Sequence, residues 1–214
     1  SGTGTTTRTV TISSITGDGT LGITLAASTA SDTAGNSAAA AGPSTTFTVD
    51  NTAPTVAIGS PSVSSTQTGP VTYTITYSGA NTVTLVAGNV TLNKTGTANG
   101  TVAVSGTGTT TRTVTISSIT GDGTLGITLA ASTASDTAGN LAAAAGPSQI
   151  FTVDNTAPTV AIGTPSATST RTGPVTYTIT YSGANTVTLA TGNVTLNKTG
   201  TANGTVAVSG TGTT

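Results

Sequence analysis

Aspartate supplies every side-chain carboxylate in this chain, and carboxylates can bind a metal ion, act as acids or bases, or cap turns. The six aspartates form two sets with the same internal spacing, Asp18, Asp32 and Asp50 followed by Asp122, Asp136 and Asp154. Carboxylate oxygens that converge from separate loops are the ligands that Ca²⁺ prefers. A lone aspartate in a turn instead caps the backbone of that turn. The fold decides between these two roles, because it sets whether the members of a set meet.

Catalysis has few other residues to draw on. General acid–base and nucleophilic catalysis rely mainly on His, Cys and Glu, and the chain contains none of them. A Ser or Thr hydroxyl activated by Lys94 or Lys198 is the one route left, but the surrounding stretch TLNKTG is typical of a solvated strand end. A Lys–Asn isopeptide crosslink is the alternative role of these lysines, and it usually needs a buried acid beside the lysine. The sequence therefore predicts a protein that is not an enzyme.

Charge and hydropathy argue against two classes of partner. The net charge is −1, only 5% of residues are charged, and no basic run is present to neutralise the phosphates of a nucleic acid. No apolar stretch approaches the roughly 20 residues that a membrane-spanning helix needs. Low net charge together with abundant β-branched residues predicts a folded β protein rather than a disordered chain.

An internal repeat of 104 residues organises the chain. Residues 1–110 and 105–214 differ at nine pairs of positions: Ser37/Leu141, Thr45/Gln149, Thr46/Ile150, Ser60/Thr164, Val63/Ala167, Ser64/Thr168, Gln67/Arg171, Val86/Ala190 and Ala87/Thr191. A period of this length matches a whole small domain and is too long for one turn of a solenoid.

Domain boundaries are predicted at the stretch Asp-Asn-Thr-Ala-Pro, which occurs at 50–54 and again at 154–158. Proline fixes its own φ and disfavours a helical residue before it, so this stretch should form an extended hinge. Cutting there gives one complete unit at 53–156. It is preceded by the C-terminal part of a unit at 1–52 and followed by the N-terminal part of the next at 157–214.

Period-2 alternation of apolar residues predicts about seven short strands in the complete unit. Their expected ranges are Thr55–Ile58, Val71–Tyr77, Val90–Leu92, Val102–Val104, Val114–Ile116, Leu125–Leu129 and Phe151–Val153. Short antiparallel strands separated by Gly- and Asn-rich turns predict an all-β fold of tandem immunoglobulin-like β-sandwich domains.

The same alternation predicts which side chains are buried. Thr72, Thr74 and Thr76 should face outward from one strand. The expected core consists of Val71, Ile75, Val114, Ile116, Leu125, Ile127, Phe151 and Val153.

Three motifs at this spacing resemble the bacterial Ig-like repeats of giant secreted adhesins and other surface proteins. They are GDGTL at 121–125, SDTAGN at 135–140 and FTVDNTAP at 151–158, each with an earlier copy 104 residues upstream. The resemblance covers essentially the whole chain. It implies extender units on the cell surface that hold a binding tip or a sheath away from the cell, with Ca²⁺ at the domain junctions in some members.

A sandwich of seven strands receives the chain at one end and releases it at the other, so successive units should stack end to end. A further strand at 82–86 would change this parity. The residues expected at the first junction are Asp18, Asp50, Asn51 and Asp136, and the equivalent residues at the second are Asp122, Asp154 and Asn155. Converging carboxylates would repel one another unless Ca²⁺ joins them. The alternative is that each aspartate caps its own turn.

The favoured function is structural: a non-catalytic repeat of an extracellular filament or giant surface protein that extends or sheaths the cell and supports adhesion. Its expected partners are neighbouring copies of the repeat, end to end and also laterally, because few charges guard the sheet edges. The part at 157–214 should be completed by a following 1–52 part, either in one continuous polypeptide, which we favour, or between subunits. The alternative function is a binding module for ice, carbohydrate or a cell-surface ligand; the row of threonines points to ice.

Overall fold

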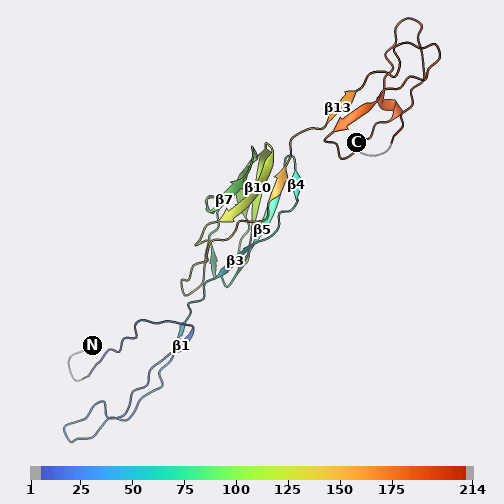
Figure 1. Ribbon diagram of the computed structural model, residues 1–214. Helices are drawn as coiled ribbons and strands as arrows, with labels where there is room; N and C mark the ends of the chain where they lie inside the picture. Colours follow the sequence, from blue (N-terminus) through green and yellow to red (C-terminus); the bar gives the residue numbers. More distant parts are fainter. Residues whose placement is uncertain (1–5, 211–214) are drawn as a thin grey trace. The chain divides into compact units, whose positions relative to one another are not determined.

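The computed structural model describes residues 6–210, and its secondary structure consists of β-strands with two short 3-10 turns (Figure 1). The prediction of an all-β protein is therefore confirmed. The chain divides into two compact units, Ser1–Asn155 and Thr156–Thr214, and the boundary between them falls in the second hinge.

The central region at 53–156 contains two four-stranded sheets. The first has the order β3 (Thr55–Ile58), β5 (Val71–Ser78), β9 (Thr111–Thr120) and β8 (Asn99–Ser105), and all of its pairs are antiparallel. The second has the order β4 (Ser65–Thr66), β12 (Phe151–Val153), β10 (Gly123–Leu129) and β7 (Val90–Lys94). Each of the seven predicted ranges overlaps a strand of three or more residues in these sheets.

Two details of the predicted topology are wrong. The pair formed by β4 and β12 is parallel. β4 is a two-residue strand at the edge of the second sheet, and β12 is the last strand of the unit. A strand was not expected at 82–86, yet β6 (Thr82–Val83) pairs with β11 (Ala134–Ser135) in a small separate sheet. The short turn η1 (Ala87–Asn89) follows β6 and leads into β7.

One hydrophobic core lies between the sheets, as the alternation predicts. All eight predicted core residues are at most 1% exposed, and both tyrosines of β5 are buried with them. The rings of Tyr73 and Phe151 lie 6.5 Å apart between centroids. Burying one such side chain stabilises the fold by about 1.5–3 kcal/mol. Tyr73 Oη donates to the carbonyl oxygen of Gln149 at 2.7 Å, so its polar end is satisfied.

The outer face of the first sheet carries the predicted row of threonines and a second row that matches it. Thr74 and Thr76 are exposed as predicted, whereas Thr72 is half-buried. The register of β5 and β9 sets three threonine pairs side by side: Thr72 with Thr115, Thr74 with Thr113, and Thr76 with Thr111.

Arginine at position 112 departs from the simple apolar pattern of the inner face. Arg112 is only 9% exposed and is opposite Ile75 in the β5–β9 register. Its guanidinium donates to the carbonyl oxygens of Thr111 at 2.8 Å and Val83 at 3.1 Å. The side chain therefore ties β6 to the edge of the core with backbone acceptors.

The segments on either side of the central region contain few strands. Residues 6–52 form β1 (Gly19–Leu21) and β2 (Phe47–Val49), and the second unit forms β13 (Thr159–Ile162), β14 (Ile179–Ser182) and η2 (Thr191–Asn193). Their apolar side chains are largely exposed even though their sequences nearly match the central region. Phe47, for example, is 45% exposed, whereas its counterpart Phe151 is 1% exposed.

Candidate functional site

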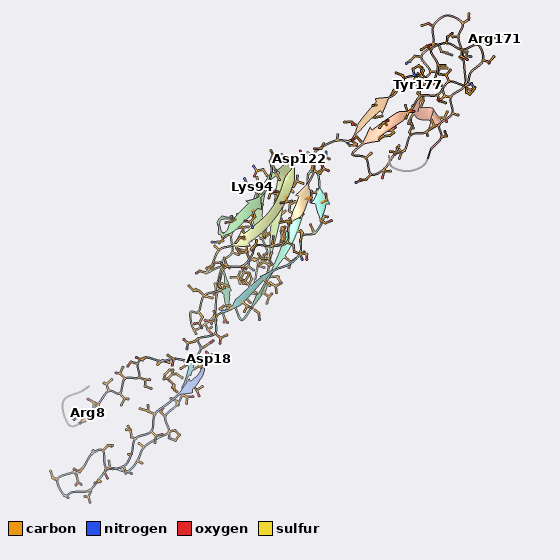
Figure 2. The ribbon with its side chains drawn as sticks, in the orientation of Figure 1. Arg8, Asp18, Lys94, Asp122, Arg171 and Tyr177 are labelled. Carbon is orange, nitrogen blue, oxygen red and sulfur yellow. The ribbon has the colours of Figure 1, made fainter. Side chains whose placement is uncertain are left out.

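The hinge at 50–54 is the place where the predicted site residues meet, and Asp18 holds it from the preceding repeat. One carboxylate oxygen of Asp18 accepts a hydrogen bond from the backbone N–H of Asn51. The other accepts from Thr52 Oγ1 at 3.0 Å, and Asn51 Nδ2 donates to the carbonyl oxygen of Gly17. Figure 2 labels Asp18, which lies in the turn that opens β1. The Gly-Asp-Gly turn therefore acts as a brace for the hinge backbone.

The following repeat holds the same hinge through Asn140. The side-chain amide of Asn140 donates one hydrogen bond to Asp136 Oδ2 at 2.8 Å and another to the backbone carbonyl oxygen of Asp50 at 2.9 Å. Asp136 Oδ1 in turn accepts from the backbone N–H groups of Gly139 and Asn140. Pro54 is buried. Side chains from both repeats thus form hydrogen bonds with the first three residues of the hinge, Asp50, Asn51 and Thr52.

The Asp136 turn is pre-organised by its own hydrogen bonds. The side chain of Asn140 is the main cause that holds the pKa of the Asp136 carboxyl below its usual value; burial opposes it, and the backbone N–H of Asn140 lowers the pKa further. The ionised carboxylate is the form that accepts these bonds. These bonds within the turn therefore orient the Asn140 side chain for its contact with the carbonyl oxygen of Asp50.

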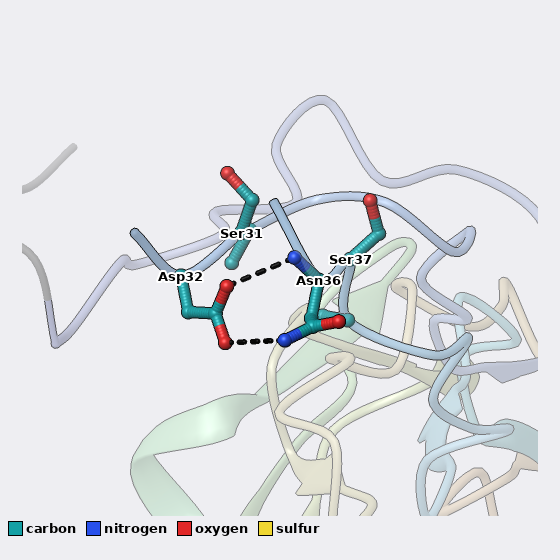
Figure 3. Close-up of a pocket in the computed structure, with 6 residues that line it drawn as sticks. Ser31, Asp32, Asn36 and Ser37 are labelled. Carbon is teal, nitrogen blue, oxygen red and sulfur yellow. Dashed lines mark hydrogen bonds between the residues drawn. The ribbon is translucent and has the colours of Figure 1, made fainter. Parts of the chain in front are cut away.

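The first copy of this turn shows the same internal bonds. Asp32 Oδ1 accepts from the backbone N–H of Asn36 at 2.9 Å, and Asp32 Oδ2 accepts from Asn36 Nδ2 at 2.9 Å, as Figure 3 shows. The pKa of Asp32 is likewise lowered, chiefly by the Asn36 side chain. The residues on both sides of the turn line an open hollow here: Ala30, Ser31, Asp32, Asn36, Ser37 and Ala38. The turn is thus a local structure of the sequence SDTAGN, whereas the contact with the hinge is tertiary.

The second hinge repeats the brace of the first. Asp122 Oδ1 accepts from the backbone N–H of Asn155, and Asn155 Nδ2 donates to the carbonyl oxygen of Gly121 at 2.6 Å. Asp154 directly follows β12, and its N–H donates to the carbonyl oxygen of Thr66 at 3.1 Å. The Gly-Asp-Gly turn lies at the end where the chain leaves the central region, and the SDTAGN turn at the end where it enters.

The carboxylates near the first hinge accept hydrogen bonds from different partners. Within residues 6–210, no group of three or more His, Cys, Asp or Glu side chains is placed to hold a metal ion. The carboxylate of Asp18 accepts from the hinge, and that of Asp136 accepts from its own turn. The predicted residues are therefore linked by hydrogen bonds, and calcium at the junction stays a prediction.

The two lysines each form a hydrogen bond with a nearby asparagine on the surface. Lys94 Nζ donates to Asn99 Oδ1 at 3.2 Å across the turn between β7 and β8, and Lys198 repeats this with Asn203 at 3.2 Å. Both pairs are exposed. Formation of an isopeptide bond needs a deprotonated amine and an acid that activates the amide carbonyl. The observed contact is instead that of a solvated strand end.

The sequence placed Thr52 in the hinge but did not reveal its bond to Asp18, and it did not reveal Asn140 as a partner of the hinge. The four-residue spacing between Asp136 and Asn140 could have revealed their mutual bond, since an aspartate that caps a turn commonly bonds to groups two to four residues away. Nothing local could have revealed the bond from Asn140 to Asp50, because the two residues are 90 positions apart.

Comparison with protein-family models, with curated proteins and with solved structures finds no match to this chain. In the part of the chain that the structure describes, no helix is long and apolar enough to span a membrane.

Proposed function

We propose that this chain is a structural, non-catalytic repeat of an extracellular filament or giant surface protein, built from Ig-like β-sandwich units joined end to end. The observation that carries the proposal is the hinge, which is hydrogen-bonded by the repeat before it and by the repeat after it. A connection that only tethered two domains would need no such contacts.

The pattern of bonds favours a stiff connection. Asp18 holds the backbone N–H of Asn51 and the hydroxyl of Thr52, while Asn140 holds the carbonyl oxygen of Asp50. Flexible linkers between domains are typically rich in Gly and Ser and leave their backbone to water. Restricting the hinge keeps successive units in a reproducible orientation, which suits a protein whose task is to extend.

The repeat itself supports a role that depends on length. Two copies that differ at nine positions encode the same hinge motifs twice, including GDG and SDTAGN. The resemblance to bacterial Ig-like repeats suggests the cell surface as the location and neighbouring repeats as the partners. A calcium ion would strengthen the junction if the carboxylates converge in a longer array.

Backbone NMR relaxation tests the hinge. We expect the N–H groups of Asn51 and Thr52 to have order parameters close to the value of about 0.85 that is typical of rigid backbone. Asn140→Ala removes the bond to Asp50 and should lower them toward the range of flexible segments, below about 0.6. The matched control is Asn36→Ala, which removes the same bond within the first copy of the turn and should leave the hinge unchanged.

Two results would contradict the proposal: order parameters of a flexible linker in the unmodified chain, or equal effects of the two substitutions. The spectra should be recorded at a concentration where the chain is monomeric, so that association does not itself restrict the hinge.

Ice binding is the second candidate, and the in-register threonine rows on β5 and β9 favour it. Three pairs, Thr72/Thr115, Thr74/Thr113 and Thr76/Thr111, place hydroxyl and methyl groups in a two-dimensional array without charge. Neighbouring strands in a sheet are about 4.8 Å apart and alternate residues on one strand about 6.7 Å apart. An assay of ice recrystallisation with Thr74→Lys as the comparison decides this candidate, which is excluded if the unmodified chain has no effect on crystal growth.

A further inference from the structure

We propose that Asn99 is an acceptor site for an N-linked sugar on the folded central region. This region contains three matches to the acceptor pattern Asn-x-Thr, which begin at Asn89, Asn93 and Asn99. Threonine is abundant in this chain, so the pattern alone does not single out an acceptor. The exposure and the hydrogen bonds of the three asparagines do, because they leave one of the three side-chain amides accessible.

Attachment of an N-linked sugar uses the side-chain nitrogen of asparagine as the nucleophile. Nδ2 forms a bond to C1 of a sugar that is activated as a diphosphate ester. The bond between C1 and the diphosphate oxygen breaks, the diphosphate leaves with the electron pair, and a base of the transferase takes one proton from Nδ2. The reaction therefore needs an Nδ2 that a large enzyme and its sugar donor can reach.

Asn93 lies within β7, and its amide nitrogen is already used in the fold. The side chain is half-buried, and Nδ2 donates to Thr128 Oγ1 on β10 at 2.8 Å. The hydroxyl of Thr95, which completes this pattern, lies 2.7 Å from Thr124 Oγ1 and accepts from the backbone N–H of Thr124 at 2.8 Å. A sugar on Asn93 would break the side-chain bond between β7 and β10, so the folded sheet disfavours it.

Asn89 is held in the turn η1, directly before β7. Its side chain is half-buried, and Oδ1 accepts from the backbone N–H of Val86 at 3.0 Å. Its backbone N–H donates to the carbonyl oxygen of Val86, and its carbonyl oxygen accepts from the N–H of Ala130, both at 2.9 Å. These bonds hold the amide against the turn, so a transferase would have to open the turn to reach it.

Asn99 differs from both in its exposure and in the bonds of its amide. It is the first residue of β8 and is exposed. Its Oδ1 accepts from the side chain of Lys94, which Figure 2 labels, at 3.2 Å. Within residues 6–210, its Nδ2 donates to no protein group. The contact with Lys94 thus orients the amide through its oxygen and leaves the nucleophilic nitrogen accessible.

The backbone around Asn99 also favours access. The register between β8 and β9 shifts between Asn99 and Thr101, so the ladder is irregular at Gly100. Thr101 is exposed, and its Oγ1 lies 3.1 Å from the carbonyl oxygen and 3.0 Å from the Oγ of Ser117. Segments whose hydrogen bonds are exposed to solvent open locally more easily than the core. The asparagine and the threonine of this pattern therefore both lie where a transferase can bind them.

A sugar at this position would shield an open sheet edge. β8 is an edge strand of the first sheet, whose order is β3, β5, β9 and β8. Edge strands are commonly protected by charged side chains, but only 5% of the residues of this chain are charged. An N-linked sugar is bulky and solubilising. It would supply at the start of β8 the protection that charges supply in other proteins.

Glycosylation of the purified, folded chain tests the inference. It rests on the proposed function only for the extracellular location that brings the chain to transferases, and this assay is independent of the hinge. One arm uses a soluble N-glycosyltransferase with UDP-glucose, and the other a membrane oligosaccharyltransferase with a lipid-linked oligosaccharide, which distinguishes the two sources of activated sugar. Trypsin then releases Asn99 in the peptide 95–112 and its copy in the peptide 199–214, which differ in length. We expect the sugar on the peptide 95–112 in at least one arm, and none on Asn89 or Asn93.

Substitutions within the acceptor pattern identify the residue that is modified. Asn99→Gln keeps a side-chain amide but removes the acceptor, so the peptide 95–112 should lose its sugar. Thr101→Ala should abolish the modification as well, whereas Thr101→Ser keeps the pattern and should retain it. Asn93→Gln is the matched control and should leave the amount of sugar on the peptide 95–112 unchanged.

An unfolded variant tests whether the fold makes the selection. Ile75→Asp places a charge in the core and should unfold the central region, which circular dichroism verifies. Asn89 and Asn93 should then accept sugar as Asn99 does. An Asn99 that stays unmodified in both arms would overturn the inference, and so would equal modification of Asn93 and Asn99 in the folded chain. An Asn93 that stays unmodified even in the unfolded variant would show that the fold is not the cause of the selection.

Discussion

The stretch VTYTITYS occurs twice, and replacing its isoleucine with alanine at each site separates tertiary burial from local propensity. Ile75 is 0% exposed in the centre of β5, whereas Ile179 in β14 is half-buried. The two residues have identical neighbours along the chain for seven positions on each side. Any difference between Ile75→Ala and Ile179→Ala therefore reports on packing alone.

The expected size of the effect follows from the burial of each side chain. Ile75→Ala removes buried methyl and methylene groups between Tyr73 and Tyr77 and leaves a cavity, which typically costs 2–5 kcal/mol, here about 3 kcal/mol. The whole domain is expected to be stable by only about 5–15 kcal/mol. Ile179→Ala should leave the stability of the central region within about 0.5 kcal/mol, as is usual for substitutions away from the core.

Urea unfolding followed by tyrosine fluorescence and far-UV circular dichroism measures both effects. With a denaturant dependence of about 1.5 kcal/mol per molar urea, a loss of about 3 kcal/mol lowers the unfolding midpoint by about 2 M. The measurement is made at a concentration at which the chain is monomeric. Equal shifts for the two variants would refute the assigned core and its register.

Two other predictions test the turns and the buried tyrosine. Gly121 has a φ of +76°, and a Cβ there would collide with the backbone of Thr97. Gly121→Ala should therefore destabilise the central region by about 3 kcal/mol, through left-handed backbone strain and overpacking. Gly17→Ala is the control: no atom lies within 4 Å of its added Cβ, so the urea midpoint of the central region should not change. Burial raises the pKa of the Tyr73 hydroxyl. The unfolded chain therefore loses this proton at a lower pH than the folded chain, and stability should fall as the pH rises above about 10. Tyr73→Phe should flatten this alkaline loss while costing about 1 kcal/mol at neutral pH for the missing hydrogen bond, and an unchanged alkaline loss would assign it to another group.

The hinge shows where local and tertiary information divide. Proline at position 54 and the Asp-Asn-Thr stretch before it predict an extended segment between domains, since their backbone preferences are local. The Asp136 turn is equally local, and it forms alike around Asp32 in the first copy. The bond from Asn140 to Asp50 requires two segments 90 positions apart to be brought together, which only the folded chain does.

Strand pairing shows the same division. Alternation of apolar residues identified the seven main strands and their inner faces, because side chains on a strand alternate between its two sides. It did not identify the two-residue strands β4, β6 and β11, which are too short to carry a pattern. The burial of Arg112 was also missed, since its acceptor on β6, the carbonyl oxygen of Val83, becomes available only when β6 lies against the core.

The sequence by itself determined the repeat, the hinge positions, the all-β class and the residues able to form a core. Tertiary structure alone decided which copy of each residue is buried. Phe47 and Phe151 share the stretch FTVDN, yet one is 45% and the other 1% exposed. The physical reason is that a β-strand forms its backbone hydrogen bonds with other strands and buries its apolar face against them. Its local sequence determines which side chains share the apolar face, but the partner that buries this face comes from elsewhere in the fold.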